Sequence, residues 1–456
     1  MKISSLTLIL FFTWLAGLMP FTASAQETDP VLEHLIEKGL EKSHSLNINQ
    51  LETEQAQVDQ KLAKSVFLPK LTVTGSYTRL NDDISFDDDT QSLLKATQKL
   101  LIKEAAGIPF NAAFPEHIPL QDINNLQNKD ILKSSVDVDW VIFSGFEASN
   151  ALKAARHKES SLRYAGMAER DHIILSIIET YDQLALVNAS EEVLAASEAF
   201  LEDQEHYVKK AIENGLATPI SRQKVALARQ QLAARQLEYS HNRKLLIERL
   251  HQLTGEDKEV LRSLEPKLAP MSPDNLTPAK RNEILALEEA EKATAYKAKM
   301  EKSHFIPKIA LKGHYEFLED DLSLFDPQWY AAVGVKWNLF DGGQSRLNSR
   351  KTQLEAGKFR QQIEEAEEMI ALSIVKAEHT YEASLQNSRI AQKEIELAGA
   401  TYEMVNKQYK NNLATITDVL DALRDLESAN FQLQESYYNQ RRALTALLHS
   451  KGQLNY

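Results

Sequence analysis

Apolar and polar residues alternate along four short segments of the chain, each about nine residues long. In the first segment, Leu71, Val73 and Tyr77 alternate with Thr72 and Thr74. The same period of two recurs around Val136, Val138 and Trp140, around Ile309, Leu311 and Tyr315, and around Val333, Val335 and Trp337. This pattern predicts strands with one apolar face and one polar face, the polar face including Asp137, Asp139 and Lys336. About nine residues is also the length of a tilted strand that crosses a bilayer.

Two much longer segments show helical periodicity instead. They run from about Ala148 to Asn214 and from about Gln344 to Asn411, and neither contains proline. In the first, Ile174, Ile177 and Ile178 begin an apolar stripe of the kind that packs in coiled coils. At a rise of about 1.5 Å per residue, each segment predicts a helix of roughly 100 Å.

The chain repeats one plan twice. Residues 64–71 match residues 302–309 at an offset of 238. Beyond this point the offset becomes 197, as in Trp140 and Trp337, and it persists to Gly452. The change of offset places 41 extra residues in the first copy, between its two strands. A constant offset over such a length indicates an internal duplication, with the order helix, strand, loop, strand, long helix, tight turn, helix.

These features divide the chain into four parts. Residues 1–25 have a positive start, an apolar run and a small-residue cleavage pattern ahead of Gln26, which together predict a secretory signal peptide. An uncleaved N-terminal anchor is the alternative. Residues 26–265 form the first repeat, residues 266–278 a proline-rich linker and residues 279–456 the second repeat.

Composition narrows the functional classes. The 456-residue chain has no cysteine, which excludes disulfides, thiolate metal sites and cysteine nucleophiles. Its net charge of −13 argues against a nucleic-acid partner, because a phosphate backbone requires a basic face. Catalytic and nucleotide-binding motifs are missing and the 12 histidines show no metal-ligand spacing, so we expect neither an enzyme nor a bound metal or cofactor.

Membrane insertion would depend on the strands. After the N-terminal run, no stretch approaches 18 consecutive apolar residues, so we expect no transmembrane helix in the mature chain. Only a closed β-barrel could then cross the bilayer. Four strands leave two open edges, so several copies of the chain would have to close one barrel together. The need to pair the edges does not determine the number of copies.

Aromatic residues flank the strands at matching positions. In each repeat, aromatic residues precede the first strand, which we call the rising strand, and end the second, which we call the descending strand. These residues should share one membrane interface as a girdle. The six are Phe67, Trp140, Phe143, Phe305, Trp337 and Phe340. A soluble sandwich with a buried tryptophan is the alternative, although four strands make a poor sandwich by themselves.

The combined motifs resemble those of TolC-type outer-membrane efflux proteins. Phe-x-Pro precedes a strand in each copy, Trp-x-x-Phe-x-Gly-Gly begins at Trp337, and each helical hairpin has a Leu-Ala-Thr tip. The resemblance covers nearly the whole mature chain. It implies an α+β membrane protein, a homotrimer whose long antiparallel helices form a helical barrel and whose four β-strands per chain complete a 12-stranded trimeric β-barrel.

The resemblance also implies a location and partners. The barrel would lie in the lipid of the outer membrane of a Gram-negative bacterium, and the helices would extend into the periplasm. A periplasmic membrane-fusion adaptor and an inner-membrane RND or ABC transporter would complete the assembly.

Each long helix ends at a sharp turn. The turns read Asn214-Gly215-Leu216-Ala217-Thr218-Pro219 and Asn411-Asn412-Leu413-Ala414-Thr415. Gly215 and Asn412 suit the left-handed conformation that ends a helix, and Thr218 can cap the next helix. The resemblance implies that these tips, with Asn214, Leu216 and Leu413, contact the adaptor, while a purely structural hairpin is the simpler interpretation.

Asp418 and Asp421 follow the second tip. Their i, i+3 spacing places both carboxylates on one helix face, and a ring of them in an oligomer would select cations and raise some of their pKa values. The resemblance implies that they constrict the periplasmic end of the tunnel as a pore gate, and that Tyr409 helps to lock it. A capping box of Thr415 with Asp418 is the alternative, and both roles can coexist.

The tips also depart from the family pattern. Ala414 stands where the family often has a basic residue. In the first copy, Ser221 stands at the position of Asp418 and is flanked by Arg222 and Lys224. The bonds that close the tunnel must therefore differ in detail.

The extra residues of the first copy are rich in aspartate. They include Asp82, Asp83, Asp87, Asp88 and Asp89. A divalent-cation site is one interpretation, and a solvated extracellular loop is the favoured one, since outer-membrane barrels carry their long loops on that side. The helix-forming run from Thr90 to Ala106 could also fold inward across the mouth.

A duct leaves two kinds of cargo open. Small molecules would leave with a proton-driven pump and proteins, by type I secretion, with an ATP-driven transporter, and the sequence does not choose between them. We favour small-molecule efflux. A periplasmic coiled-coil scaffold without a pore would explain the helices but not the alternating strands.

Overall fold

The computed structural model describes residues 29–269, 276–319 and 327–454. The signal peptide predicted at residues 1–25 lies outside them. The chain forms two compact units: a helical unit from Met1–Leu51, Arg163–Leu285 and Glu364–Tyr456, and a sheet unit from Glu52–Leu162 and Ala286–Ile363. Each unit takes segments from both predicted repeats, so a repeat is not a compact unit by itself, and the bounds of the repeats stay a prediction.

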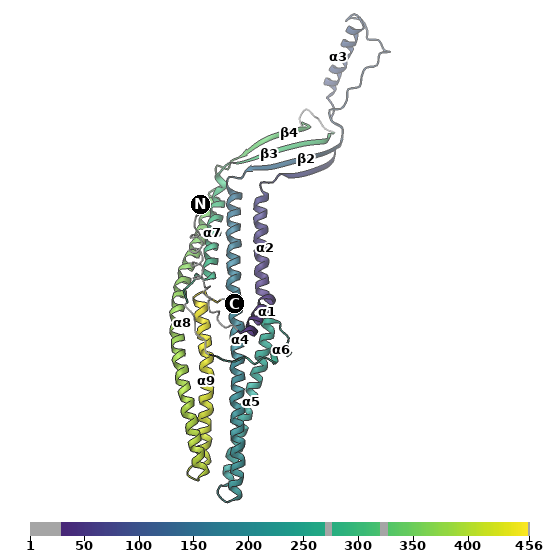
Figure 1. The fold of residues 1–456 in the computed structure, drawn as a ribbon. Coiled ribbons are helices and arrows are strands. Elements are labelled where there is room, and N and C mark those ends of the chain that lie inside the picture. The colour runs from purple at the N-terminus through teal and green to yellow at the C-terminus, as the bar shows by residue number, and fades with distance from the viewer. Residues whose placement is uncertain (1–28, 270–275, 320–326, 455–456) are drawn as a thin grey trace, which may run out of the picture. The chain divides into compact units, whose positions relative to one another are not determined.

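Long helices and one sheet account for most of the described chain (Figure 1). The helices are α1 Pro30–Lys42, α2 His44–Ser65, α3 Asp88–Ala105, α4 Glu147–Glu213, α5 Pro219–Thr254, α6 Lys258–Arg262, α7 Asn282–Lys302, α8 Gln344–Lys410 and α9 Ile416–Ser450, with a 3-10 turn at Ser303–Phe305. The strands are β1 Lys70–Arg79, β2 Asp130–Phe143, β3 Lys308–Glu319 and β4 Trp329–Lys336. No helix in the described part of the chain is long and apolar enough to cross a membrane.

The bounds of the elements repeat with the offsets found in the sequence. Helices α4 and α8 each have 67 residues and begin 197 positions apart, at Glu147 and Gln344. Helices α5 and α9 begin at the same separation, at Pro219 and Ile416. The two long helices predicted from periodicity are confirmed, and their length is possible because neither contains a proline that would remove an i to i−4 hydrogen bond.

The sheet unit contains one antiparallel sheet in the order β1-β2-β3-β4. Leu71 lies opposite Val138, and Leu311 lies opposite Val333, so apolar side chains share one face. This face has no cover in the described chain, since Leu71 is 66 % exposed and Val333 is 68 % exposed. The predicted two-faced strands are confirmed, and β1 and β4 are the two open edges of the sheet.

Residues 80–129 connect β1 to β2 and contain α3, which is the predicted helix-forming run. The Asp87 carboxylate accepts a hydrogen bond from the Thr90 amide (3.0 Å), and Asp83 accepts one from the Lys129 amide (2.6 Å). Two of the five aspartates therefore fix the loop backbone. Within the described ranges, no group of three or more histidine, aspartate or glutamate side chains could hold a metal ion.

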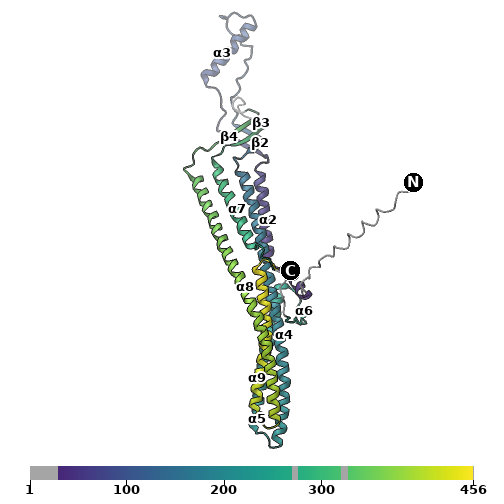
Figure 2. The ribbon, with the colours of Figure 1, turned by 60° about the vertical axis from the view of Figure 1, so that its left-hand side comes forward.

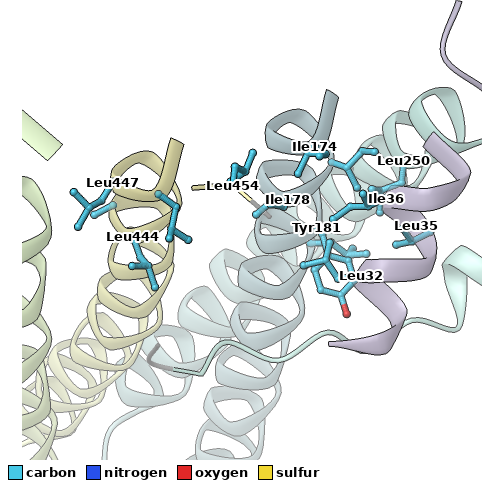
Figure 3. Close-up of a cluster of buried hydrophobic side chains, with 14 of the residues drawn as sticks. Leu32, Leu35, Ile36, Ile174, Ile178, Tyr181, Leu250, Leu444, Leu447 and Leu454 are labelled. Atoms are coloured by element: carbon cyan, nitrogen blue, oxygen red, sulfur yellow. The ribbon is translucent and has the colours of Figure 1, made fainter. Parts of the chain in front are cut away.

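The main core of the helical unit lies where α1 packs against the long helices. Figure 3 shows Leu35 and Ile36 of α1 beside Ile178 of α4 and Leu250 of α5. Burial of such side chains stabilises a fold by about 1.5–3 kcal/mol each. The approach of α1 to α4 depends on Gly39, because a Cβ atom there would lie 2.3 Å from the Cδ1 atom of Ile177.

A second apolar cluster joins the α4–α5 hairpin to the α8–α9 hairpin. Its buried members come from all four helices and include Leu194, Leu201, Val208, Val225, Leu232, Tyr402, Tyr409, Ile416, Val419 and Leu423. Figure 2 shows the four helices side by side in this part of the helical unit. The cluster therefore holds the two helix turns of the chain at one end of that unit.

The repeated strand ends give a matched test of backbone geometry. Gly145 and Gly342 hold equivalent positions after β2 and β4, with φ of 65° and 68°. A Cβ at Gly145 would lie 2.9 Å from the carbonyl oxygen of Ile306, whereas nothing lies within 4 Å of one at Gly342. We expect Gly342→Ala to cost about 1 kcal/mol through backbone strain alone. Gly145→Ala should cost more, because the Ile306 backbone must also move.

The midpoint of thermal unfolding in detergent measures both losses. An equal or smaller loss for Gly145→Ala than for Gly342→Ala would contradict the close approach of Ile306.

Candidate functional site

Four of the six predicted girdle residues are joined by matching hydrogen bonds. The indole Nε1 of Trp140 donates to the carbonyl oxygen of Phe67 (2.9 Å), and that of Trp337 donates to the carbonyl oxygen of Phe305 (3.0 Å). Each bond ties the end of a descending strand to the turn before a rising strand. The two copies therefore hold their tryptophans in the same way.

The other two girdle residues lie at the same end of the sheet. Phe143 is the last residue of β2 and packs edge-on against Phe146, with ring centroids 5.1 Å apart. Phe340 follows β4 and is 85 % exposed. Exposed aromatic rings whose polar atoms are bonded suit the boundary between lipid and water. The structure brings the six residues to one end of the sheet, and their contact with lipid stays a prediction.

The helix turns depend on two residues with left-handed backbone. Gly215 has φ of 73° and Asn412 has φ of 60°. Glycine adopts this conformation without a steric cost, and asparagine adopts it more readily than most residues. The prediction that Asn412 takes the place of glycine in the second turn is confirmed.

Both turns present a leucine to solvent. The Leu216 amide donates to the Ala211 carbonyl oxygen and the Leu413 amide donates to the Gln408 carbonyl oxygen, both at 2.8 Å. These bonds close the last turn of α4 and of α8 as Schellman motifs. The leucine side chains are 64 % and 78 % exposed, so the motif fixes an apolar side chain outside the core.

The two turns lie side by side (Figures 1 and 2). The Lys224 Nζ atom of α5 donates to the Thr417 Oγ1 atom of α9 (2.6 Å). The Tyr207 hydroxyl of α4 donates to the Lys410 carbonyl oxygen of α8 (3.2 Å). Asn214 is exposed, and its side-chain amide donates to its own helix, so it supports the first turn without joining the second.

Asp418 forms the capping box that the sequence allowed. Its Oδ2 atom accepts hydrogen bonds from the Thr415 amide and the Thr415 hydroxyl, both at 2.7 Å, and the Thr415 Oγ1 atom accepts one from the Asp418 amide (3.3 Å). The first hairpin differs, since the Thr218 side chain makes no capping hydrogen bond. Thr218 therefore holds the N-cap position of α5, as expected, but its side chain does not bond the helix. Ser221 at the position of Asp418 carries no carboxylate to complete the box.

The two candidate gate carboxylates have different surroundings. Hydrogen bonds from the Thr415 amide and hydroxyl hold the pKa of Asp418 below its ordinary value of 3.8, and Lys224 acts in the same direction. Asp421 lies 3.1 Å from the guanidinium of Arg424, one helical turn further on. Both carboxylates are exposed in the chain. They share a helix face, but each already has a partner in its own chain.

Tyr409 lies in the apolar cluster rather than in solvent. Its side chain is 9 % exposed, and its ring meets that of Tyr207 edge-on with centroids 5.2 Å apart. Burial raises the pKa of the Tyr409 hydroxyl above 10.0. The pair links α4 to α8 immediately above the turns.

Sequence reasoning missed three of these contacts. The ion pair of Asp421 with Arg424 could have been predicted, because their i, i+3 spacing places them together on the helix surface. The bond from Lys224 to Thr417 and the packing of Tyr207 on Tyr409 had no such signal, because each joins helices that are far apart in the chain.

Residues 275–453 match the family model of outer membrane efflux proteins. No curated protein matches the chain. The match begins in the predicted linker and covers the second repeat, where it supports the resemblance that the duplicated motifs indicated.

Solved structures match the fold of nearly the whole chain. The outer membrane protein VceC of Vibrio cholerae has a TM-score of 0.72 at 19 % identity, covering 92 % of this chain and 96 % of that one. The CmeC outer membrane channel of Campylobacter jejuni has a TM-score of 0.71 at 15 % identity, with coverages of 94 % and 88 %. The open state of the MtrE outer membrane channel of Neisseria gonorrhoeae has a TM-score of 0.68 at 17 % identity, with coverages of 93 % and 89 %. The fold class is therefore confirmed as that of outer-membrane channels.

The two helix caps give a testable difference. Thr415→Ala removes the hydroxyl of the capping box and should destabilise the start of α9 by about 1 kcal/mol. Thr218→Ala is the matched control, and it should have a smaller effect because its side chain makes no capping hydrogen bond. Hydrogen exchange of the amides of residues 416–418 and 220–221 measures each change, since Pro219 has no amide hydrogen. Equal acceleration in both hairpins would contradict the difference between the caps.

The same cap should depend on pH. Because the pKa of Asp418 is lowered in the folded chain, the carboxylate contribution is complete above pH 3.8 and is lost as the pH falls through the lower folded value. Amide exchange at the start of α9 should therefore show no loss of protection between pH 7 and about pH 5. A loss of protection in that interval, relative to the start of α5, would contradict the lowered pKa.

Proposed function

We propose that three copies of this chain form an outer-membrane duct through which small molecules leave the cell. The open sheet edges carry this proposal. Strands β1 and β4 have no partner on their outer sides within the described chain, and their apolar face is exposed. Unpaired backbone groups cannot remain in lipid, so β4 of one copy pairs with β1 of the next until the barrel closes.

Closure by this contact is head to tail. The two edges differ, so each copy presents one edge to a neighbour and the other edge to a second neighbour, and the contacts generate a ring. Three copies of a four-stranded sheet give a 12-stranded barrel. The apolar face then meets lipid, the aromatic strand ends lie at one interface, and the polar face lines a water-filled lumen.

The helix turns supply the periplasmic end of the duct. Exposed Leu216 and Leu413, each next to a residue with left-handed backbone, suit contact with a periplasmic adaptor, which connects the duct to an inner-membrane pump of the RND or ABC type. Asp418 and Asp421 of three copies form an acidic ring at the gate. The buried Tyr409 holds α8 against α4 behind that ring. Efflux of small molecules is preferred to protein secretion because the matched family is one of efflux proteins.

Introduced disulfides test the trimeric closure directly. The chain has no cysteine of its own, and Thr72 of β1 and Ala332 of β4 both belong to the polar face. Oxidation of the Thr72→Cys, Ala332→Cys protein in membranes should give bands of one, two and three chains on a denaturing gel. Gly334→Cys replaces Ala332→Cys in a parallel variant, because the register between copies decides which pair is close enough.

Each single-cysteine variant is the control and should stay at one chain. Bands that continue beyond three chains, or a series that stops at two chains, would contradict a closed trimer.

The acidic ring should control the passage of cations. Asp418→Ala with Asp421→Ala removes two carboxylates from each chain and should weaken block by a multivalent cation added at the periplasmic side, by at least about tenfold in the blocking concentration. Single-channel recording in a planar bilayer measures this block. Asp425→Ala is the control, because Asp425 is an exposed carboxylate of the same helix. Glu427 is unsuitable because its carboxylate forms an ion pair with Arg235. Unchanged block in the double variant would contradict the gate.

A further inference from the structure

Lysine side chains gather at one end of the polar face of the sheet. Lys70 opens β1, Lys308 opens β3 and Lys336 closes β4, so all three lie at the end where the aromatic residues are found. Lys312 lies four residues after Lys308 along β3, on the same face of the sheet. We call these four residues the lysine collar. This inference rests on the proposed function, because it takes the polar face to line the lumen.

The register confirms that these side chains share a face. Lys308 lies opposite Lys336, and Lys70 lies opposite Asp139, which in turn lies opposite Lys312. A small hollow of about 210 Å³ on the same face is lined by residues of all four strands, namely Thr72, Asp137, Val138, Asp139, Lys312, Gly313 and Tyr330. The collar therefore borders a concave part of the polar face.

Of the four lysines, only the two on the central strand β3 form ion pairs with carboxylates of the described residues. The Lys312 Nζ atom lies 3.7 Å from the Asp139 Oδ1 atom, and the Lys308 Nζ atom bonds to Glu147 at the start of α4. In the part of the chain that the structure describes, neither Lys70 nor Lys336 has an ion-pair partner, and both are exposed. Two positive charges per chain thus remain uncompensated, and both lie on the open edge strands.

Closure of the barrel changes the surroundings of those two charges. At each seam, β4 of one copy lies beside β1 of its neighbour, so Lys336 of one copy and Lys70 of the next point into the lumen from adjacent strands. Two ammonium groups on adjacent strands of one face repel each other in the absence of an anion. An anionic group between them relieves that repulsion and gains charge-assisted hydrogen bonds.

We propose that the seams of the barrel form anion-binding sites, three per duct, in which Lys70 and Lys336 hold a carboxylate, phosphate or sulfonate group of a passing solute. The collar favours anionic solutes over cationic solutes in the barrel part of the duct, as rings of lysine or arginine do in anion pores. This preference is opposite to that of the acidic ring at the helix turns. The collar thus points to organic anions as a class of cargo.

Ion selectivity in a planar bilayer tests the collar. The Asp418→Ala, Asp421→Ala protein serves as the background, so that the acidic ring does not dominate the signal. In a tenfold gradient of potassium chloride, Lys70→Gln with Lys336→Gln should lower the ratio of anion to cation permeability by at least about twofold. Inorganic pyrophosphate added at the loop side should block the background channel, and the lysine variant should need a several-fold higher concentration.

Lys133→Gln is the matched control. It removes one lysine from the same face at the other end of the sheet, where Lys133 lies 4.0 Å from Glu316, and it should change selectivity less than the seam variant. Conducting channels with unchanged selectivity and unchanged pyrophosphate block in the Lys70→Gln, Lys336→Gln protein would overturn the collar and leave the duct intact. A background protein that forms no conducting channels would overturn the proposed duct and the collar together.

Discussion

The unpaired backbone of the two edge strands constrains every other feature of this protein. On the outer sides of β1 and β4, the backbone amide and carbonyl groups have no neighbouring strand to bond with in the described chain. In lipid each such group would cost several kcal/mol, so a four-stranded sheet with an exposed apolar face is incomplete as a single chain. In the proposed barrel, pairing between copies of the chain satisfies both edges at once, and it also determines which face meets lipid and which face meets water.

The duplicated plan supplies what this closure needs. Each repeat within the chain contributes a hairpin whose tryptophan indole donates a hydrogen bond to the turn before its first strand. Trp140 donates to the Phe67 carbonyl oxygen, and Trp337 donates to the Phe305 carbonyl oxygen. These bonds fix the lower ends of the strands without using the edge backbone. The long helices follow directly from the strand ends, and the left-handed Gly215 and Asn412 return the chain at the two turns. The duplication gives equivalent strands and helices in the two repeats. The repeats differ in the loop that contains α3 and in the capping box at Thr415.

Local signals in the sequence were sufficient for the elements and insufficient for the contacts between them. The period-two strands, the 67-residue helices and the left-handed Asn412 each depend on neighbours in the chain, so pattern and turn chemistry predicted them. The capping box at Thr415 was predictable for the same reason, whereas the equivalent Thr218 makes no side-chain capping bond and Ser221 has no carboxylate to complete a box. Tyr207 of α4 packs on Tyr409 of α8, but the two tyrosines are not equivalent positions of the repeat and lie far apart in the chain, so no periodicity could reveal their contact.

The proposed duct requires three identical chains to close one barrel and one helical tube. Electron microscopy of the protein extracted from outer membranes in detergent tests it most directly. We expect threefold particles in which a tube of roughly 100 Å, the length set by the rise of a 67-residue helix, projects from a detergent belt. Compact particles without threefold symmetry, or particles that need no detergent, would contradict it.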